Sequence, residues 1–99
     1  MKKQRLNPSE NCCYEFELIQ GENLKGVISS SSHIDIYLVT NTSFSKWMIG
    51  ETFEQECCNE SVIEAKIEFL APKEGTWYLI IENNGTKTSK VEVMIRVSS

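Results

Sequence analysis

The chain has 99 residues, of which 40% are hydrophobic and 24% charged, and its formal net charge is −4 at pH 7. A chain of about 100 residues can bury one core but not two, so we expect one globular domain. No apolar run approaches the roughly 18 residues that a membrane-spanning helix needs. The acidic balance repels phosphate backbones, which disfavours a nucleic-acid partner.

Residues 1–11 are expected to form a flexible N-terminal lead-in, and residues 12–99 a single β-sandwich domain. The lead-in contains a turn around Pro8, and Leu6 is its only large apolar side chain after the first residue. Its basic cluster is not followed by the apolar stretch of a signal peptide. The protein is therefore expected to stay in the cytoplasm, unless the sequence is a domain excised from a longer chain.

The first half of the chain predicts three strands. A strand with one buried face repeats its apolar side chains at every second position, and residues 12–18 and 33–39 both follow this pattern. Residues 24–30 predict a shorter strand in which Gly26 is placed to form a bulge. Beyond Thr40 the signal weakens, and we expect either two short strands at 46–50 and 53–58 or an excursion of the chain around Gly50.

The strongest supersecondary signal is a β-hairpin formed by residues 62–70 and 76–83. Pro72 and Gly75 supply the turn chemistry between the two strands. The second strand is almost continuously apolar, as expected of a strand covered on both sides, and Trp77 is its expected core anchor. A last alternating strand follows at 88–97, after a turn.

These segments predict an all-β fold, specifically a two-sheet antiparallel β-sandwich of jelly-roll type with about seven or eight strands. Most of the strands have one apolar face, and they cannot all bury it in a single layer. No window of the sequence shows a persuasive helical period.

Two cysteine doublets, Cys12-Cys13 and Cys57-Cys58, are the most unusual feature of the sequence. Disulfides between them would indicate an extracellular or lumenal domain, whereas reduced cysteines that pack as small hydrophobic residues would indicate the cytoplasm. A zinc site is disfavoured, because its ligands are usually separated by about two to four residues. Nothing marks an activated thiolate. We expect no metal and no cofactor, and both redox states stay open.

His33, the only histidine, lies two residues before Asp35. A hydrolase would use His33 as base, Asp35 to orient it and a serine of the run 29–32 as nucleophile. Side chains two positions apart on a strand project side by side, and no glycine cluster for an oxyanion hole accompanies them. We therefore assign no catalytic residue and treat the pair, with the aromatic Tyr37 and Trp47, as a candidate binding surface.

Several segments together carry a family resemblance: Cys13-Tyr14-Glu15-Phe16, Gly21, Leu24-Lys25-Gly26, His33 to Val39, Phe69-Leu70-Ala71-Pro72, Gly75 to Leu79, Glu82-Asn83 and Val91 to Val97. On these segments the chain resembles the GOLD (Golgi-dynamics) β-sandwich, and it is also similar to bacterial prepeptidase C-terminal domains. The first resemblance implies a non-catalytic domain that recruits proteins or lipids on secretory membranes. The second implies an accessory domain beside an enzyme.

The sequence departs from the GOLD pattern in its cysteines. Secretory cargo receptors of this type pair an early cysteine with one in the penultimate strand, and residues 77–83 contain none. That disulfide is therefore not carried over.

The residues and the resemblance together predict a non-catalytic binding module whose partner is another protein or a neighbouring domain. One alternative is a carbohydrate-binding or accessory domain of a secreted enzyme, with a glycan or small molecule as ligand. The other is a small hydrolase that uses His33 and Asp35.

Overall fold

The computed structural model describes residues 2–55 and 57–98, apart from the side chain of Cys57. Within these ranges the chain forms β1 (Lys2–Leu6), β2 (Asn11–Leu18), β3 (Asn23–Thr40), α1 (Asn41–Met48), β4 (Cys57–Leu70), β5 (Gly75–Glu82) and β6 (Ser89–Ser98). No helix in this part of the chain has the length and apolarity needed to cross a bilayer. The expectation of an all-β protein is confirmed.

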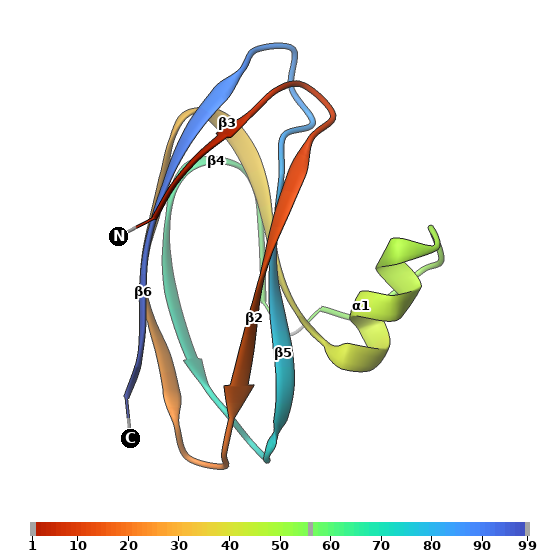
Figure 1. The fold of residues 1–99 in the computed structure, drawn as a ribbon, viewed down its shortest axis with the longest axis vertical. Coiled ribbons are helices and arrows are strands. Elements are labelled where there is room, and N and C mark those ends of the chain that lie inside the picture. The colour runs from red at the N-terminus through yellow and green to blue at the C-terminus, as the bar shows by residue number, and fades with distance from the viewer. Residues whose placement is uncertain (1, 56, 99) are drawn as a thin grey trace.

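All of these strands belong to one antiparallel sheet with the order β1-β6-β3-β5-β2, and β4 pairs with the other edge of β3. Residues 23–30 of β3 pair with β6, and residues 35–40 pair with β5. Figure 1 shows β3 and β4 arching over together, so that the sheet curls and its two parts face each other. We call the part with β1 and β6 the β6 half, and the part with β2 and β5 the β5 half.

Serine hydroxyls support the bend of β3. The strand pairs with β6 up to Ser30 and with β5 from Asp35 onward. In between, the Ser31 hydroxyl accepts from the Lys90 amide at 2.8 Å, and the Ser32 hydroxyl contacts that of Ser89. These contacts satisfy polar groups where the ladder is interrupted. The prediction of two separate strands at 24–30 and 33–39 was therefore wrong, because the serines carry one strand through the bend.

The main core lies between the two halves and draws on both. Its fully buried side chains include Leu6, Leu18, Leu24, Ile28, Ile34, Ile36, Leu38, Ile67, Trp77, Leu79 and Ile81. Trp77 is 2% exposed, so its predicted role as a core anchor is confirmed. Its ring packs against Phe69 with 5.7 Å between ring centroids.

The predicted hairpin of residues 62–70 and 76–83 does not form. Both strands exist as β4 and β5, but β4 pairs with β3 whereas β5 pairs with β2 and β3. The turn that joins them is instead bonded to the turn before β3: the Gly21 amide donates to the Ala71 carbonyl at 3.0 Å, and the Ala71 amide donates to the Glu22 carbonyl at 2.9 Å. The turn chemistry correctly predicted that the chain reverses its direction. In the structure this reversal takes the chain from the β6 half to the β5 half.

The N-terminal segment also differs from its prediction. Residues 2–6 are strand β1, paired with β6 from Lys2 opposite Val93 to Leu6 opposite Ser89, and they are not a flexible lead-in. Leu6 is 2% exposed in the core, and its carbonyl accepts from the side-chain amide of Asn83 at 2.9 Å. One apolar side chain and a sheet edge suffice to order this polar segment. The described residues thus form six strands, fewer than the predicted number.

Candidate functional site

Helix α1 lies against the outer surface of the β5 half and overlaps the strand that the sequence predicted at 46–50 (Figure 1). Of the second predicted strand, 53–58, residues 53–55 have no regular structure and residues 57–58 begin β4. The Thr40 hydroxyl caps α1 by accepting from the Ser43 amide at 3.3 Å, an arrangement that favours a helix start. The expectation of a strand at 46–50 was wrong, because this cap and the packing of one helix face on the sheet outweigh the residues' modest helix propensity.

Aromatic rings join α1 to the sheet. Phe44 stacks on Tyr78 of β5, with 3.9 Å between ring centroids and 9° between the planes, and also stacks against Trp47 at 5.7 Å. Val39 and Ile80 project from the same outer surface of the sheet and are nevertheless fully buried. The helix therefore covers a second, smaller apolar layer outside the main core.

Carboxylates border these rings and accept their polar hydrogens. The Trp47 indole N–H donates to Glu82 Oε1 at 2.8 Å, and the Tyr78 hydroxyl donates to Glu15 Oε1 at 2.9 Å. The bond to Glu15 raises the pKa of Tyr78, because the neutral phenol is the donor. Asn84 donates from its side-chain amide to Asp35 Oδ2 at 2.6 Å and to Glu82 Oε2 at 3.4 Å.

Tyr37 lies in the same region, with its ring edge-on to Phe53 at 6.0 Å between centroids. Removal from water, followed by the negative charges of Asp35 and Glu82, raises the pKa of Tyr37 to about 12. Both effects disfavour the tyrosinate, so Tyr37 stays a neutral hydrogen-bonding group at physiological pH.

We call this surface the acidic aromatic face and define it by Glu15, Asp35, Tyr37, Phe44, Trp47, Tyr78 and Glu82. Its charged groups are all carboxylates, which accept hydrogen bonds and attract cations. Aromatic rings beside them provide surfaces on which guanidinium or ammonium groups stack. Such a surface is suited to a partner that presents Arg or Lys side chains.

The structure brings together three of the four residues that the sequence suggested as a binding surface. Tyr37, Trp47 and Asp35 lie around Glu82. His33 is exposed at the bend of β3, and its ring makes no hydrogen bond within the described part of the chain. Asp35 accepts from the Ser61 amide at 2.8 Å and from Asn84, so it does not orient His33 as a hydrolase would require.

The cysteine doublets lie in different strands of the β5 half. Cys13 is opposite Ile80 of β5, Ile80 is opposite Tyr37 of β3, and Tyr37 is opposite Cys58 of β4. Each step between strands is about 4.8 Å, so roughly 14 Å separates the two positions, about twice the Cα distance that a disulfide spans.

The side chains of Cys12 and Cys13 show no sign of activation. Burial raises the pKa of the Cys12 thiol and, with the charges of Cys12 and Glu82, that of Cys13 to about 11. Cys12 and Cys13 are free thiols. The side chain of Cys57 lies outside the described part of the chain, so the prediction of a disulfide or of reduced cysteines stays a prediction. Among the described residues, no group of three His, Cys, Asp or Glu side chains is arranged to hold a metal ion.

Sequence reasoning missed Phe44, Tyr78 and Glu82, which hold the face together. The spacing of Phe44 and Trp47 by three residues, after a capping threonine, was the available signal for one face of a helix. Glu82 was not identifiable, because its contact with Trp47 joins positions 35 residues apart.

No family model and no curated protein matches the sequence. Among solved structures, the chain is similar to PliG of Aeromonas hydrophila, a periplasmic lysozyme inhibitor of g-type lysozyme, with a TM-score of 0.63 and 12% sequence identity. The match covers 96% of this chain and 83% of that one. At this identity the likeness concerns the fold, which the two proteins share over most of their length.

Proposed function

We propose that this chain is a non-catalytic module that binds another protein through the acidic aromatic face. The observation that carries the proposal is the arrangement of Glu82, Glu15 and Asp35 around the rings of Trp47, Phe44 and Tyr78. Charge-assisted bonds to carboxylates are stronger than neutral ones, and aromatic residues carry much of the binding energy of protein interfaces. The partner should therefore present a basic surface.

We further propose a sandwich architecture for the binding module. The β6 half and the β5 half face each other across a shared apolar core, as two layers of a β-sandwich do (Figure 1). The two layers hold the acidic aromatic face on a rigid support.

A g-type lysozyme is our first candidate for the partner. PliG, which shares the fold, is described as an inhibitor of that enzyme, and inhibition requires no chemistry from the inhibitor. The GOLD resemblance remains a proposal of the same kind, because it also implies a domain that recruits proteins.

The test follows cell-wall lysis by a g-type lysozyme as a loss of turbidity, with increasing amounts of the purified chain. We expect lysis to stop near equimolar protein, and the double variant Asp35→Asn, Glu82→Gln to need at least about tenfold more, because two charge contacts are lost. The matched control Glu64→Gln, Glu74→Gln removes the same charge outside the face and should inhibit like the unaltered chain. Unimpeded lysis at a large excess of the chain would refute the lysozyme as partner, and equal potency of both double variants would refute the face.

A further inference from the structure

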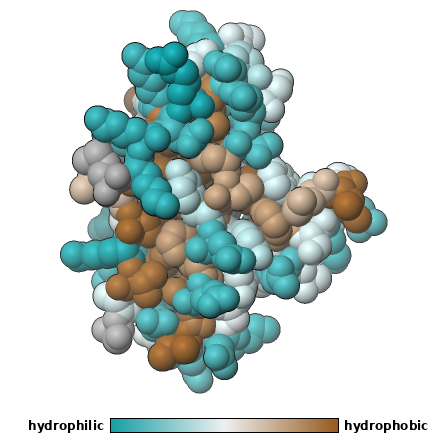
Figure 2. Space-filling view, in the orientation of Figure 1, coloured by the Kyte–Doolittle hydropathy of each residue, from teal (hydrophilic) through white to brown (hydrophobic). Residues whose placement is uncertain are grey.

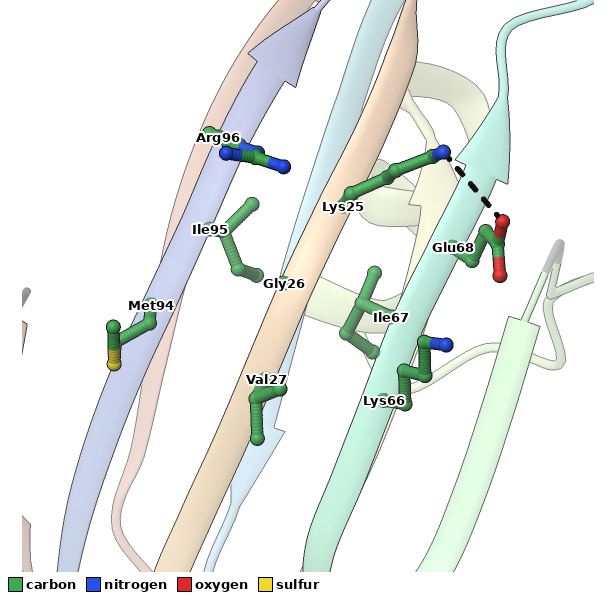
Figure 3. A pocket seen from close by; sticks show the side chains of 9 residues that line it. All are labelled: Lys25, Gly26, Val27, Lys66, Ile67, Glu68, Met94, Ile95 and Arg96. Atoms are coloured by element: carbon green, nitrogen blue, oxygen red, sulfur yellow. Dashed lines mark ion pairs between the residues drawn. The ribbon is translucent and has the colours of Figure 1, made fainter.

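A second candidate surface lies on the outer side of the β6 half, facing away from the acidic aromatic face. It contains a recess of about 510 Å³ between β6, β3 and β4. Figure 3 shows the residues that line it, among them Lys25, Val27, Lys66, Glu68, Met94 and Arg96. A volume of this size accommodates a few side chains of a bound segment.

The middle of the recess is apolar and accessible. Val27 of β3 lies opposite Met94 of β6, and the two side chains are 40% and 54% exposed. Next to them Gly26 has no room for a side chain, because a Cβ atom there would collide with the Met94 carbonyl. The recess thus has a small apolar floor that is accessible from solvent.

Basic side chains border this floor. Lys25 forms an ion pair with Glu68 at 3.7 Å. In the described ranges, Lys66 and Arg96 have no carboxylate within ion-pair distance, so both are available to bind an external anion. The Arg96 guanidinium lies over the groove between β6 and β3 in Figure 3, and its planar fork is suited to binding a carboxylate through two hydrogen bonds.

The basic character extends across the whole outer side of the β6 half. A neighbouring recess of about 500 Å³ is lined in part by Lys3, Arg5 and Lys90. Six basic side chains (Lys3, Arg5, Lys25, Lys66, Lys90 and Arg96) and three acidic ones (Glu64, Glu68 and Glu92) project here, which gives a formal charge of +3 in a chain whose net charge is −4. The molecule therefore separates its charges between two opposite outer surfaces.

We propose that this recess docks an acidic segment of a protein partner, with an aliphatic side chain on Val27 and Met94 and carboxylates on Lys66 and Arg96. A membrane surface fits less well. The recess is concave, and a concave site fits inserted side chains of a protein segment better than it fits the surface of a bilayer. The proposal does not depend on the acidic aromatic face, which lies on the other half.

The test uses a fluorescein-labelled peptide of alternating glutamate and leucine, titrated with the full chain while anisotropy is measured. We expect saturable binding that weakens as salt rises from about 50 to 200 mM, because the contacts are ionic. The variant Lys66→Glu, Arg96→Glu should weaken it at least about tenfold, because like charges then face each other. The control Lys46→Glu, Lys73→Glu changes the same charge away from the recess and should bind within about twofold of the unaltered chain.

Three results would overturn the proposal: no saturable binding, equal weakening by the control variant, or equal binding of a peptide in which glutamine replaces glutamate. Vesicles with a high content of anionic lipid serve as the competing probe. Vesicle binding that Lys66→Glu, Arg96→Glu abolishes, in the absence of peptide binding, would also overturn it in favour of a membrane. Circular dichroism of each variant verifies that the fold is retained.

Discussion

At the scale of single residues, Trp77 combines a large contribution to the core with an unsatisfied polar atom. The side chain is 2% exposed, and its indole nitrogen has no hydrogen-bond partner in the described part of the chain. Burial of an aromatic ring stabilises a fold by several kcal/mol, whereas a buried N–H without a partner costs roughly 1–3 kcal/mol.

This combination predicts different losses of stability for two substitutions. Trp77→Ala should lower the free energy of unfolding by about 3–5 kcal/mol, because it leaves a cavity beside Phe69. Trp77→Phe should cost clearly less, because the smaller cavity is offset by removal of the unpaired N–H. Urea denaturation of the three proteins measures both differences. A Trp77→Ala variant with the stability of the unaltered chain would contradict the burial of the Trp77 ring against Phe69.

Tyr37 predicts a pH dependence of stability. Its pKa is raised to about 12 in the folded chain from an unfolded value of 10.0, first by removal from water and then by Asp35 and Glu82. The fold favours the neutral phenol, so this stabilisation is complete below pH 10 and is lost as the pH rises toward about 12. Tyr37→Phe should therefore lose less stability between these pH values. Denaturation at pH 9, 10 and 11 tests this prediction, and parallel losses in both proteins would contradict it.

At the scale of elements, the sequence predicted what depends on local pattern. The alternation of apolar residues in 12–18 and 33–39 identified strands, because the period of two arises directly from strand geometry. The pairing partner of each strand was harder to predict from the sequence. The turn at Pro72 and Gly75 marks a reversal of the chain but does not determine whether β4 and β5 pair. β1 was missed for the same reason, since its order comes from a distant partner, β6.

Helix α1 illustrates the same limit and leads to a third prediction. Eight residues rarely form a stable helix alone, so α1 depends on its contact with the sheet. Phe44→Ala should remove the ring that stacks on Tyr78 and uncover Val39 and Ile80, at a cost of about 2–4 kcal/mol at most. Amides of α1 should then exchange hydrogen faster, while those of the main core should change less.

The exposed Met48 provides the matched control, because it lies on the same helix and makes no contact with the core. Figure 2 shows apolar side chains at the far end of α1, where Met48 and Ile49 are exposed. Met48→Ala should leave hydrogen exchange in α1 and the stability of the chain nearly unchanged. Equal acceleration of exchange by both substitutions would mean that Phe44 does not anchor the helix.

At the scale of the whole molecule, the main property of the fold is that two of its strands are continuous through both halves. β3 and β4 run through both halves, and the core between the halves takes side chains from β1 to β6. Neither half can therefore separate without exposing the apolar surface of the other. The two candidate surfaces lie outside the shared core, so their residues can change while the fold is retained.

This continuity predicts that the chain unfolds in one cooperative transition. The two tryptophans allow a direct measurement, since Trp77 is in the shared core and Trp47 is on α1 outside it. Trp47→Phe leaves Trp77 as the only indole, and its fluorescence should change at the same urea concentration as the β-sheet signal in circular dichroism. A fluorescence midpoint clearly separated from the circular-dichroism midpoint would mean that the halves unfold separately and that the continuous strands do not couple them.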